Sequence, residues 1–115
     1  MKAMIAWWDL TDTQHTAASL RAFLREEERA WQEVPGLLLK VWVSDPDKNR
    51  WGAVFLWESA EAAATARARL PRSAGELIGR PLEFREWFDI EAVVEGQHTL
   101  PSLAGLGLAL QPSAD

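Results

Sequence analysis

The sequence predicts a single α+β domain in which two helices cover one face of a four-stranded antiparallel sheet. The apolar and polar patterns follow the order strand, helix, strand, strand, helix, strand. Two adjacent apolar runs, residues 37–43 and 50–57, flank a short polar connector, which is typical of a β-hairpin. A chain of 115 residues is long enough for one hydrophobic core and too short for a second.

The first strand and first helix are expected before residue 36. The short apolar run KAMIAWW (2–8) ends at the polar DLTDT and indicates a strand. Thr11 followed by Gln14 fits a capping box at a helix start. Apolar residues then recur at helical spacing from Ala17 to Val34, and Pro35-Gly36 ends the pattern.

A hairpin and a second helix follow. LLLKVWV (37–43) and RWGAVFLW (50–57) are the paired strands, with Pro46 and Asn49 in the turn. The alanine-rich segment 59–70 predicts the second helix, and AGELIG (74–79) predicts one further turn.

The fourth strand is expected at 81–95, which completes the β-α-β-β-α-β order of the ferredoxin-like fold. We expect residues 1–95 to form the domain and 96–115 to form a C-terminal extended arm. The leucines of this arm need an apolar groove, and we expect the groove to lie on a partner subunit.

Both faces of the predicted sheet are apolar. In residues 37–43 only Lys40 interrupts the apolar side chains. In residues 50–57 most odd-numbered and even-numbered positions are apolar, so both faces of that strand are apolar. Helices cover one face only, so the other would be a large exposed apolar patch. We therefore expect a homodimer that joins the sheet faces of two copies around a two-fold axis.

Composition and charge exclude several classes of function. A net charge of −5 and a pI near 5.0 disfavour nucleic acid as a partner. No cysteine is present, so thiol chemistry and sulfur ligation of a metal are excluded. The N-terminus lacks a signal-peptide pattern, and no run approaches the ~20 apolar residues of a membrane helix. We expect a cytoplasmic protein without membrane association.

Several short segments resemble the YdhR family of monooxygenases. These are the PG before the second strand, LLKVW within it, WGAVFLW in the third strand and WFDI in the fourth. The resemblance covers about residues 3–95. It implies a dimeric α+β barrel of the kind that includes antibiotic-biosynthesis monooxygenases, with a pocket in each protomer between sheet and helices.

The chain departs from related proteins at positions that carry chemistry. Related cofactor-independent monooxygenases use an asparagine and a tryptophan in the pocket, but Asn49, the only asparagine here, falls in the predicted turn. Related haem-degrading proteins place a histidine late in the second helix, where this chain has Arg67 and Arg69. No tyrosine is present.

Three residues are candidates for catalysis: His15, Lys40 and Arg85. A buried Lys40 could bind an anionic substrate or act as a base, since burial lowers a lysine pKa. If its face meets the partner sheet instead, pairing with an acid such as Glu83 or Glu86 is expected. His15 could be a general acid or base, or simply a solvated side chain at a helix start.

Four aromatic residues are candidates for substrate binding: Trp7, Phe23, Trp42 and Trp57. Indoles combine a large apolar surface with a polar N–H and can stack on an aromatic ligand. The alternative is ordinary packing in the core and at the interface. The two histidines are far apart in sequence and make no metal-binding pattern, so we expect no metal and no cofactor.

Two hypotheses of function follow from these observations. The first is a cofactor-independent monooxygenase that acts on a small aromatic or polycyclic substrate bound between sheet and helices. The second is a non-catalytic, small-molecule-binding or stress-related protein with the same dimeric α+β barrel. Both predict a small hydrophobic or aromatic ligand.

Overall fold

A computed structural model describes residues 1–70, 74–97 and 107–110, and its order of elements is the predicted one. The main elements are β1 (Lys2–Asp9), α1 (Ala17–Gln32), β2 (Leu37–Asp45), β3 (Arg50–Trp57), α2 (Ala60–Ala66) and β4 (Phe84–Asp89). A 3₁₀ turn (Arg67–Arg69) follows α2, and the short helix α3 (Ala74–Ile78) precedes β4.

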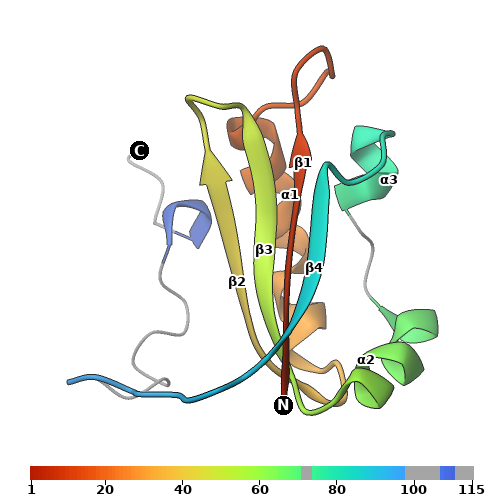
Figure 1. The fold of residues 1–115 in the computed structure, drawn as a ribbon. Coiled ribbons are helices and arrows are strands. Elements are labelled where there is room, and N and C mark those ends of the chain that lie inside the picture. The colour runs from red at the N-terminus through yellow and green to blue at the C-terminus, as the bar shows by residue number, and fades with distance from the viewer. Residues whose placement is uncertain (71–73, 98–106, 111–115) are drawn as a thin grey trace.

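The four strands form one antiparallel sheet in the order β2-β3-β1-β4. In Figure 1 helix α1 lies behind this sheet, and α2 and α3 lie along its β4 side. The predicted α+β ferredoxin-like class is therefore confirmed. Since β1 and β3 occupy the centre of the sheet, their side chains form its most enclosed part.

Helix α1 begins later than the sequence pattern predicts. Thr16 and Ser19, not Thr11 and Gln14, form the capping box: Ser19 N donates to Thr16 Oγ1 and Thr16 N to Ser19 Oγ. The reason is local, because the carboxylate of Asp9 accepts the Thr11 N–H at 2.9 Å and draws that segment into a turn.

The fourth strand and the second helix are shorter than predicted. The last β4 residue, Asp89, pairs with Lys2 at the beginning of β1, so residues beyond it have no strand to pair with. The segment 59–70 is α-helical only over Ala60–Ala66 and then tightens into the 3₁₀ turn.

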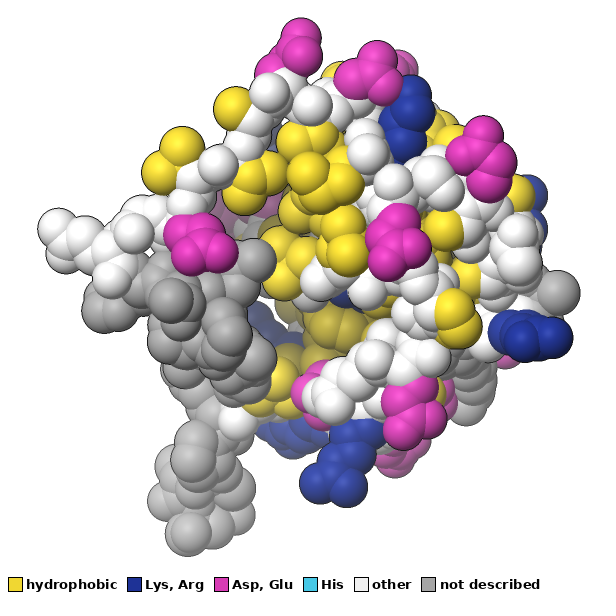
Figure 2. Space-filling model, turned by 90° about the horizontal axis from the view of Figure 1, so that it is seen from below, with side chains coloured by type: hydrophobic (Ala, Val, Ile, Leu, Met, Phe, Trp, Pro, Cys, Tyr) yellow, Lys and Arg dark blue, Asp and Glu magenta, His cyan; other side chains and the backbone are white. Residues whose placement is uncertain are grey.

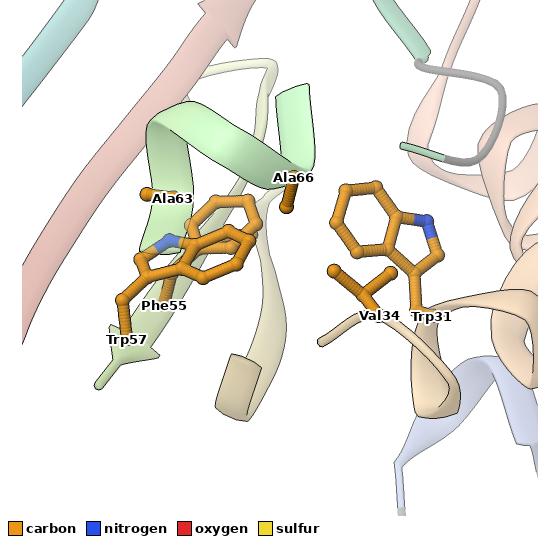
Figure 3. Packing of buried hydrophobic residues seen from close by; sticks show 7 residues of the cluster. Trp31, Val34, Phe55, Trp57, Ala63 and Ala66 are labelled. Atoms are coloured by element: carbon orange, nitrogen blue, oxygen red, sulfur yellow. The ribbon is translucent and has the colours of Figure 1, made fainter. Parts of the chain in front are cut away.

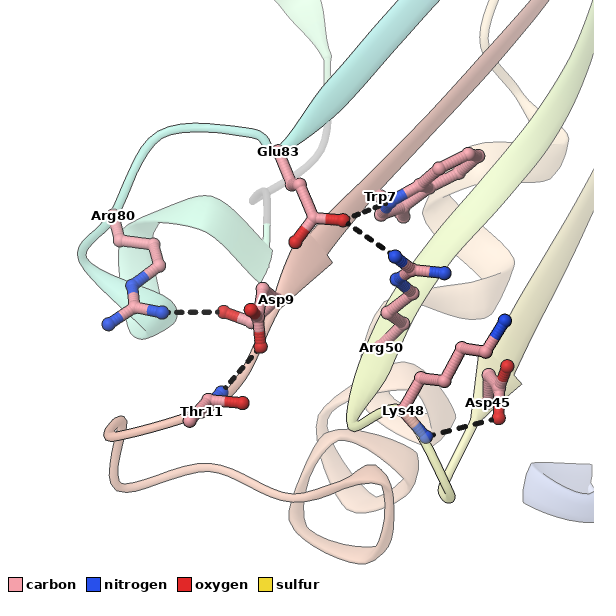
Figure 4. A network of polar contacts seen from close by, with 8 residues as sticks. All are labelled: Trp7, Asp9, Thr11, Asp45, Lys48, Arg50, Arg80 and Glu83. Atoms are coloured by element: carbon pink, nitrogen blue, oxygen red, sulfur yellow. Dashed lines mark hydrogen bonds and ion pairs between the residues drawn. The ribbon is translucent and has the colours of Figure 1, made fainter.

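The turn between β2 and β3 is confirmed. Asn49 adopts a left-handed conformation with φ of 54°, which asparagine tolerates better than most residues. Its N–H donates to Pro46 O, and Lys48 N donates to the Asp45 carboxylate (Figure 4). The Asn49 carbonyl accepts from Leu10 N at 2.7 Å, so this turn also supports the end of β1.

The buried side chains form two clusters between sheet and helices. The first joins α1, β3 and α2 and contains Trp31, Val34, Ala53, Phe55, Trp57, Ala63 and Ala66 (Figure 3). The second contains Leu10, Leu20, Leu24, Trp51, Ile78 and Ala109. Leu20, Leu24 and Trp31 lie on one face of α1, which is the stripe that its sequence period predicts.

Only part of the predicted C-terminal arm lies within the described residues. Residues 98–106 and 111–115 lie outside them. Residues Leu108–Leu110 form a 3₁₀ turn in which Ala109 is buried and its carbonyl accepts from Arg25 Nε at 2.6 Å. This turn therefore contacts α1 of its own chain, and the crossing of the arm to a partner stays a prediction. Within the described part of the chain, no helix is both long and apolar enough to cross a membrane.

We expect Gly52→Ala to destabilise the protein because β1 and β3 approach closely at this position. An added Cβ would lie 2.1 Å from Ala6 O and 2.6 Å from Trp7 Cβ, and these backbone positions are fixed by the sheet. Overpacking of this kind costs about 1 to 3 kcal/mol in the free energy of unfolding. Urea denaturation measures it, and the exposed Ser44→Ala is the control; equal midpoints for the two variants would contradict the prediction.

Candidate functional site

The pairing of β2 with β3 decides which sheet face carries Lys40. Lys40 lies opposite Phe55 and Trp42 opposite Ala53, and all four side chains point toward the helices. A bulge between Leu37 and Leu39 interrupts the alternation of β2. Leu38 lies at this bulge and is 47% exposed.

A cavity of about 250 Å³ lies between the sheet and the helices. Two rows of side chains across the sheet form its floor. The first row is Lys40, Phe55, Met4 and Trp87, and the second is Trp42, Ala53, Ala6 and Arg85. The second row holds its two alanines at the centre of the sheet, and these small side chains leave the space that the cavity occupies.

Tryptophan dominates the walls of this cavity. Six of the seven tryptophans line it: Trp8, Trp31, Trp42, Trp51, Trp57 and Trp87. Seen from below, the molecule has a hollow with hydrophobic side chains in it and Lys and Arg side chains beside it (Figure 2). An apolar cavity with a few polar groups is the usual form of a small-molecule site.

The aromatic rings come from both layers of the fold. Figure 3 shows Trp31 on α1 and the pair Phe55 and Trp57 on β3, and the rings of Trp31 and Phe55 have centroids 5.9 Å apart. Phe55 and Trp57 are stacked with centroids 6.3 Å apart, and Trp31 meets Trp42 edge-on at 6.4 Å. The Nε1 of Trp57 is buried and has no hydrogen-bond partner among the described residues.

Lys40 is the polar group at the centre of the aromatic wall. Its Nζ lies 3.2 Å from the ring centroid of Trp31, 4.4 Å from that of Trp42 and 4.7 Å from that of Phe55. Burial lowers the pKa of Lys40 from an ordinary 10.5 to about 6, because a desolvated ammonium is disfavoured. The ring faces act in the opposite direction, since their quadrupoles attract the charged form.

Lys40 has no acidic partner in the described part of the chain. The other charged residues on the cavity wall are Glu27 on α1, Arg67 after α2 and Arg85 on β4. Neither acid suggested by the sequence pairs with Lys40: Glu83 binds Arg50 at 3.1 Å, and Glu86 lies opposite Ile5 on the other sheet face. The amine is therefore available to a ligand as a base, a nucleophile or a cation.

Five of the seven residues that the sequence singles out lie on this cavity: Phe23, Lys40, Trp42, Trp57 and Arg85. The other two lie elsewhere. Trp7 is on the opposite sheet face, where it stacks on Phe84 at 4.1 Å and donates to Glu83 at 3.0 Å (Figure 4). His15 is in the loop before α1, with Nδ1 3.3 Å from Ser19 Oγ.

Four lining indoles were not among the sequence candidates: Trp8, Trp31, Trp51 and Trp87. A signal existed for two of them. Trp51 is an even number of residues from Trp57 on the same strand, so both share a face. Trp31 continues the apolar stripe of α1. Only the strand register places Trp8 and Trp87 on this face, and the sequence pattern does not predict that register.

The described residues contain no cluster of three or more histidine, aspartate or glutamate side chains that could hold a metal ion. The chemistry that these residues themselves offer is proton transfer, nucleophilic attack and anion binding at Lys40 and Arg85. The aromatic walls would orient a flat ligand beside them.

Comparison with known proteins gives structural neighbours only. No family model matches the chain, and no curated protein matches its sequence. A monooxygenase from the gene ActVA-Orf6 of Streptomyces coelicolor, solved in complex with the ligand Nanaomycin D, is 20% identical with a TM-score of 0.61. That match covers 81% of this chain and 89% of the other.

Two further structures share the fold at lower similarity. SnoaB, a cofactor-independent oxygenase from Streptomyces nogalater (mutant N63A), is 12% identical with a TM-score of 0.56 over 81% of this chain and 95% of its own. A Deinococcus radiodurans protein provisionally assigned as an antibiotic biosynthesis monooxygenase is 15% identical with a TM-score of 0.52 over 82% and 96%. The neighbours are thus antibiotic-biosynthesis-monooxygenase-like in fold, and the narrower resemblance to the YdhR family stays a prediction.

The lowered pKa of Lys40 predicts how stability depends on pH. The unfolded chain binds a proton at Lys40 below about pH 10.5, whereas the folded chain binds it only below about pH 6. Stability should therefore rise with pH between these values, by up to about 1.4 kcal/mol per pH unit, and the Lys40 contribution should be lost as pH falls toward 6.

Lys40→Met should remove this dependence and stabilise the protein near pH 7 by about 1 to 3 kcal/mol, since a buried amine without a counter-charge is replaced by an apolar group. Urea denaturation near pH 7 and pH 9 measures both effects. Lys48→Met, at an exposed lysine in the turn, is the matched control and should keep the wild-type slope. An unchanged slope in Lys40→Met would contradict the assignment.

Proposed function

We propose that the protein is a cofactor-independent monooxygenase whose substrate is a small aromatic or polycyclic molecule bound between sheet and helices. The observation that carries this proposal is the gathering around one cavity of six indoles and the amine of Lys40, which has no acidic partner among the described residues. The likeness to ActVA-Orf6 and SnoaB supports it, because both of those proteins are described as oxygenases.

The reaction needs a substrate that supplies its own electrons. An activated ring CH₂ group becomes a carbonyl: two C–H bonds break, one oxygen atom of O₂ enters the substrate, and the other leaves as water with the two protons. Lys40 in its neutral form accepts the first proton, and the ammonium that results lies beside the carbanion or enolate that meets O₂.

Other residues of the cavity would position the substrate. Trp42 and Trp57 present apolar surface to a ring system, and Phe23 contributes from α1. Arg85 lies in the same row across the sheet as Trp42 and offers a cation to an enolate oxygen or a carboxylate. Trp7 and His15 have no part in this proposal because they lie away from the cavity.

The second candidate is a protein of the same fold that binds such a ligand without turnover. It is favoured by the position of Asn49 in the β2–β3 turn and by Arg67 and Arg69 where haem-degrading relatives of the fold have a histidine. In this case the cavity and its amine would serve affinity alone.

Oxygen consumption separates the two candidates. Metal-free protein should consume O₂ when an anthrone, a quinol or a flavonoid-like phenol is added, and Lys40→Met should lower the rate at least about tenfold, since general-base catalysis contributes about 10²–10⁴-fold. Lys48→Met is the control and should retain the rate. Tryptophan fluorescence quenching by the same compounds without O₂ uptake would favour the binding protein instead.

We also propose that two copies associate through the sheet face that the helices leave open. On this face Leu39 lies opposite Leu56, and the row that begins at Val41 continues as Val54 on β3 and Ile5 on β1. Val41 and Val43 are 44% and 42% exposed, which is a high exposure for neighbouring apolar strand residues. The C-terminal residues 96–115 would strengthen this dimer by contacting the partner.

Sedimentation at micromolar concentration tests the association. The wild type should be a dimer whose interface buries on the order of 2,000 Å². Val41→Glu should shift it to a monomer, because a carboxylate would be buried without a partner. Ala64→Glu, on the exposed surface of α2, is the control and should stay dimeric. A monomeric wild type with the same fold would rule the proposal out.

A further inference from the structure

The surroundings of Lys40 suit a reaction other than proton transfer. Three rings from three elements enclose its amine: Trp31 from α1, Trp42 from β2 and Phe55 from β3. Such an enclosure stabilises a nitrogen that carries positive charge. It provides no hydrogen-bond acceptor, however, and no hydrogen bond or ion pair of Lys40 is found among the described residues.

The same position keeps the amine reactive near neutral pH. Burial lowers the pKa of Lys40 to about 6, so most of the amine is neutral, and a neutral amine has the lone pair that a nucleophile needs. The charged groups that face the cavity are Glu27, Arg67 and Arg85, which come from the helical layer and from β4. They add to one net positive charge, which does not favour a second ammonium beside them.

We propose that Lys40 Nζ is a covalent attachment point that forms a reversible imine with a small apolar aldehyde or ketone, preferably aromatic, held in this cavity. The proposal stands apart from the oxygenase proposal, because imine formation requires neither O₂ nor a redox-active substrate. It concerns the same cavity and gives it a second class of ligand.

The bond changes are those of a simple condensation. The Lys40 nitrogen attacks the carbonyl carbon, the C=O π bond breaks, and one amine proton moves to the oxygen to give a carbinolamine. The nitrogen lone pair then expels the hydroxyl group, which leaves as water with a proton, and a C=N bond forms. No electrons are gained or lost overall, and hydrolysis reverses each step.

The rings offset part of the desolvation cost of a charged product. A protonated imine places positive charge on the atom that already lies 3.2 Å from the Trp31 ring centroid, so the rings that enclose the amine also stabilise the iminium. The apolar walls limit the water that would hydrolyse it. An aromatic carbonyl compound adds stacking against Trp42 or Phe55, which a short polar aldehyde does not.

Reductive trapping tests the proposal on the intact chain. The protein is incubated near pH 7 with 2-naphthaldehyde and sodium cyanoborohydride, and the alkylated sites are located by peptide mass spectrometry. The chain has three lysines, and Lys2 and Lys48 are internal references for Lys40. We expect Lys40 to be alkylated at least about tenfold faster than either, since an ordinary lysine amine is almost entirely protonated at this pH.

Three comparisons make the result decisive. Lys40→Arg keeps a cation but cannot form an imine, so the fast site should disappear, whereas Lys48→Arg should leave it in place. In urea the wild type should lose the preference for Lys40, because the three rings no longer enclose its amine. Lowering the pH below about 6 should slow alkylation of Lys40 as the amine becomes protonated.

The opposite pattern would overturn the proposal. If folded wild-type protein is alkylated at Lys48 or at the Met1 amine while Lys40 stays unmodified, the amine is not accessible to a carbonyl ligand. Equal rates of alkylation of Lys40 in folded and urea-unfolded protein would also refute the role of the three enclosing rings. O₂ consumption is measured separately and needs no imine, so failure of the imine and failure of the oxygenase proposal are distinguishable.

Discussion

The pairing of β2 with β3 is the constraint on which the rest of the site depends. With Lys40 opposite Phe55, the one cation of β2 faces the helices and enters the aromatic cavity. A slip of one residue would turn it to the other sheet face and bring Val41 inward. The bulge after Leu37 and the turn at Asn49 hold the two ends of this pairing. The electrostatic character of the cavity thus follows from a backbone feature.

This arrangement buries the Lys40 amine, which lowers the stability of the fold, inside a cavity where the amine can act on a ligand. A buried amine without a counter-charge destabilises the folded state, and proteins that keep such groups often use them for chemistry. Here the destabilisation is offset by the surrounding apolar side chains, since Trp51, Phe55 and Trp57 of β3 are almost fully buried. The same indoles that stabilise the core also form the walls of the cavity, so packing and ligand binding depend on the same residues.

The two faces of the sheet therefore have different tasks. The helix-facing side holds the cavity, with alanines at the centre of one row and aromatic side chains around them. The opposite side is an apolar surface with a polar network at one end, where Arg50 and Trp7 both contact Glu83 (Figure 4). Trp7 belongs to this second surface, and its residue type alone does not distinguish it from the indoles of the cavity.

The sequence by itself determined the order of elements, the fold class, the hairpin and the position of Lys40 within a strand rich in apolar side chains. Period-two and period-3.6 patterns are local, and a single strand or helix is enough to show them. Tertiary structure alone decided where α1 begins, where β4 ends, which face carries Lys40, and that Trp7 and His15 lie apart from the cavity. Because both odd-numbered and even-numbered positions of β2 and β3 are apolar, the sequence did not distinguish the two faces of the sheet. Only the register of the paired strands, together with the bulge at Leu38, resolved them.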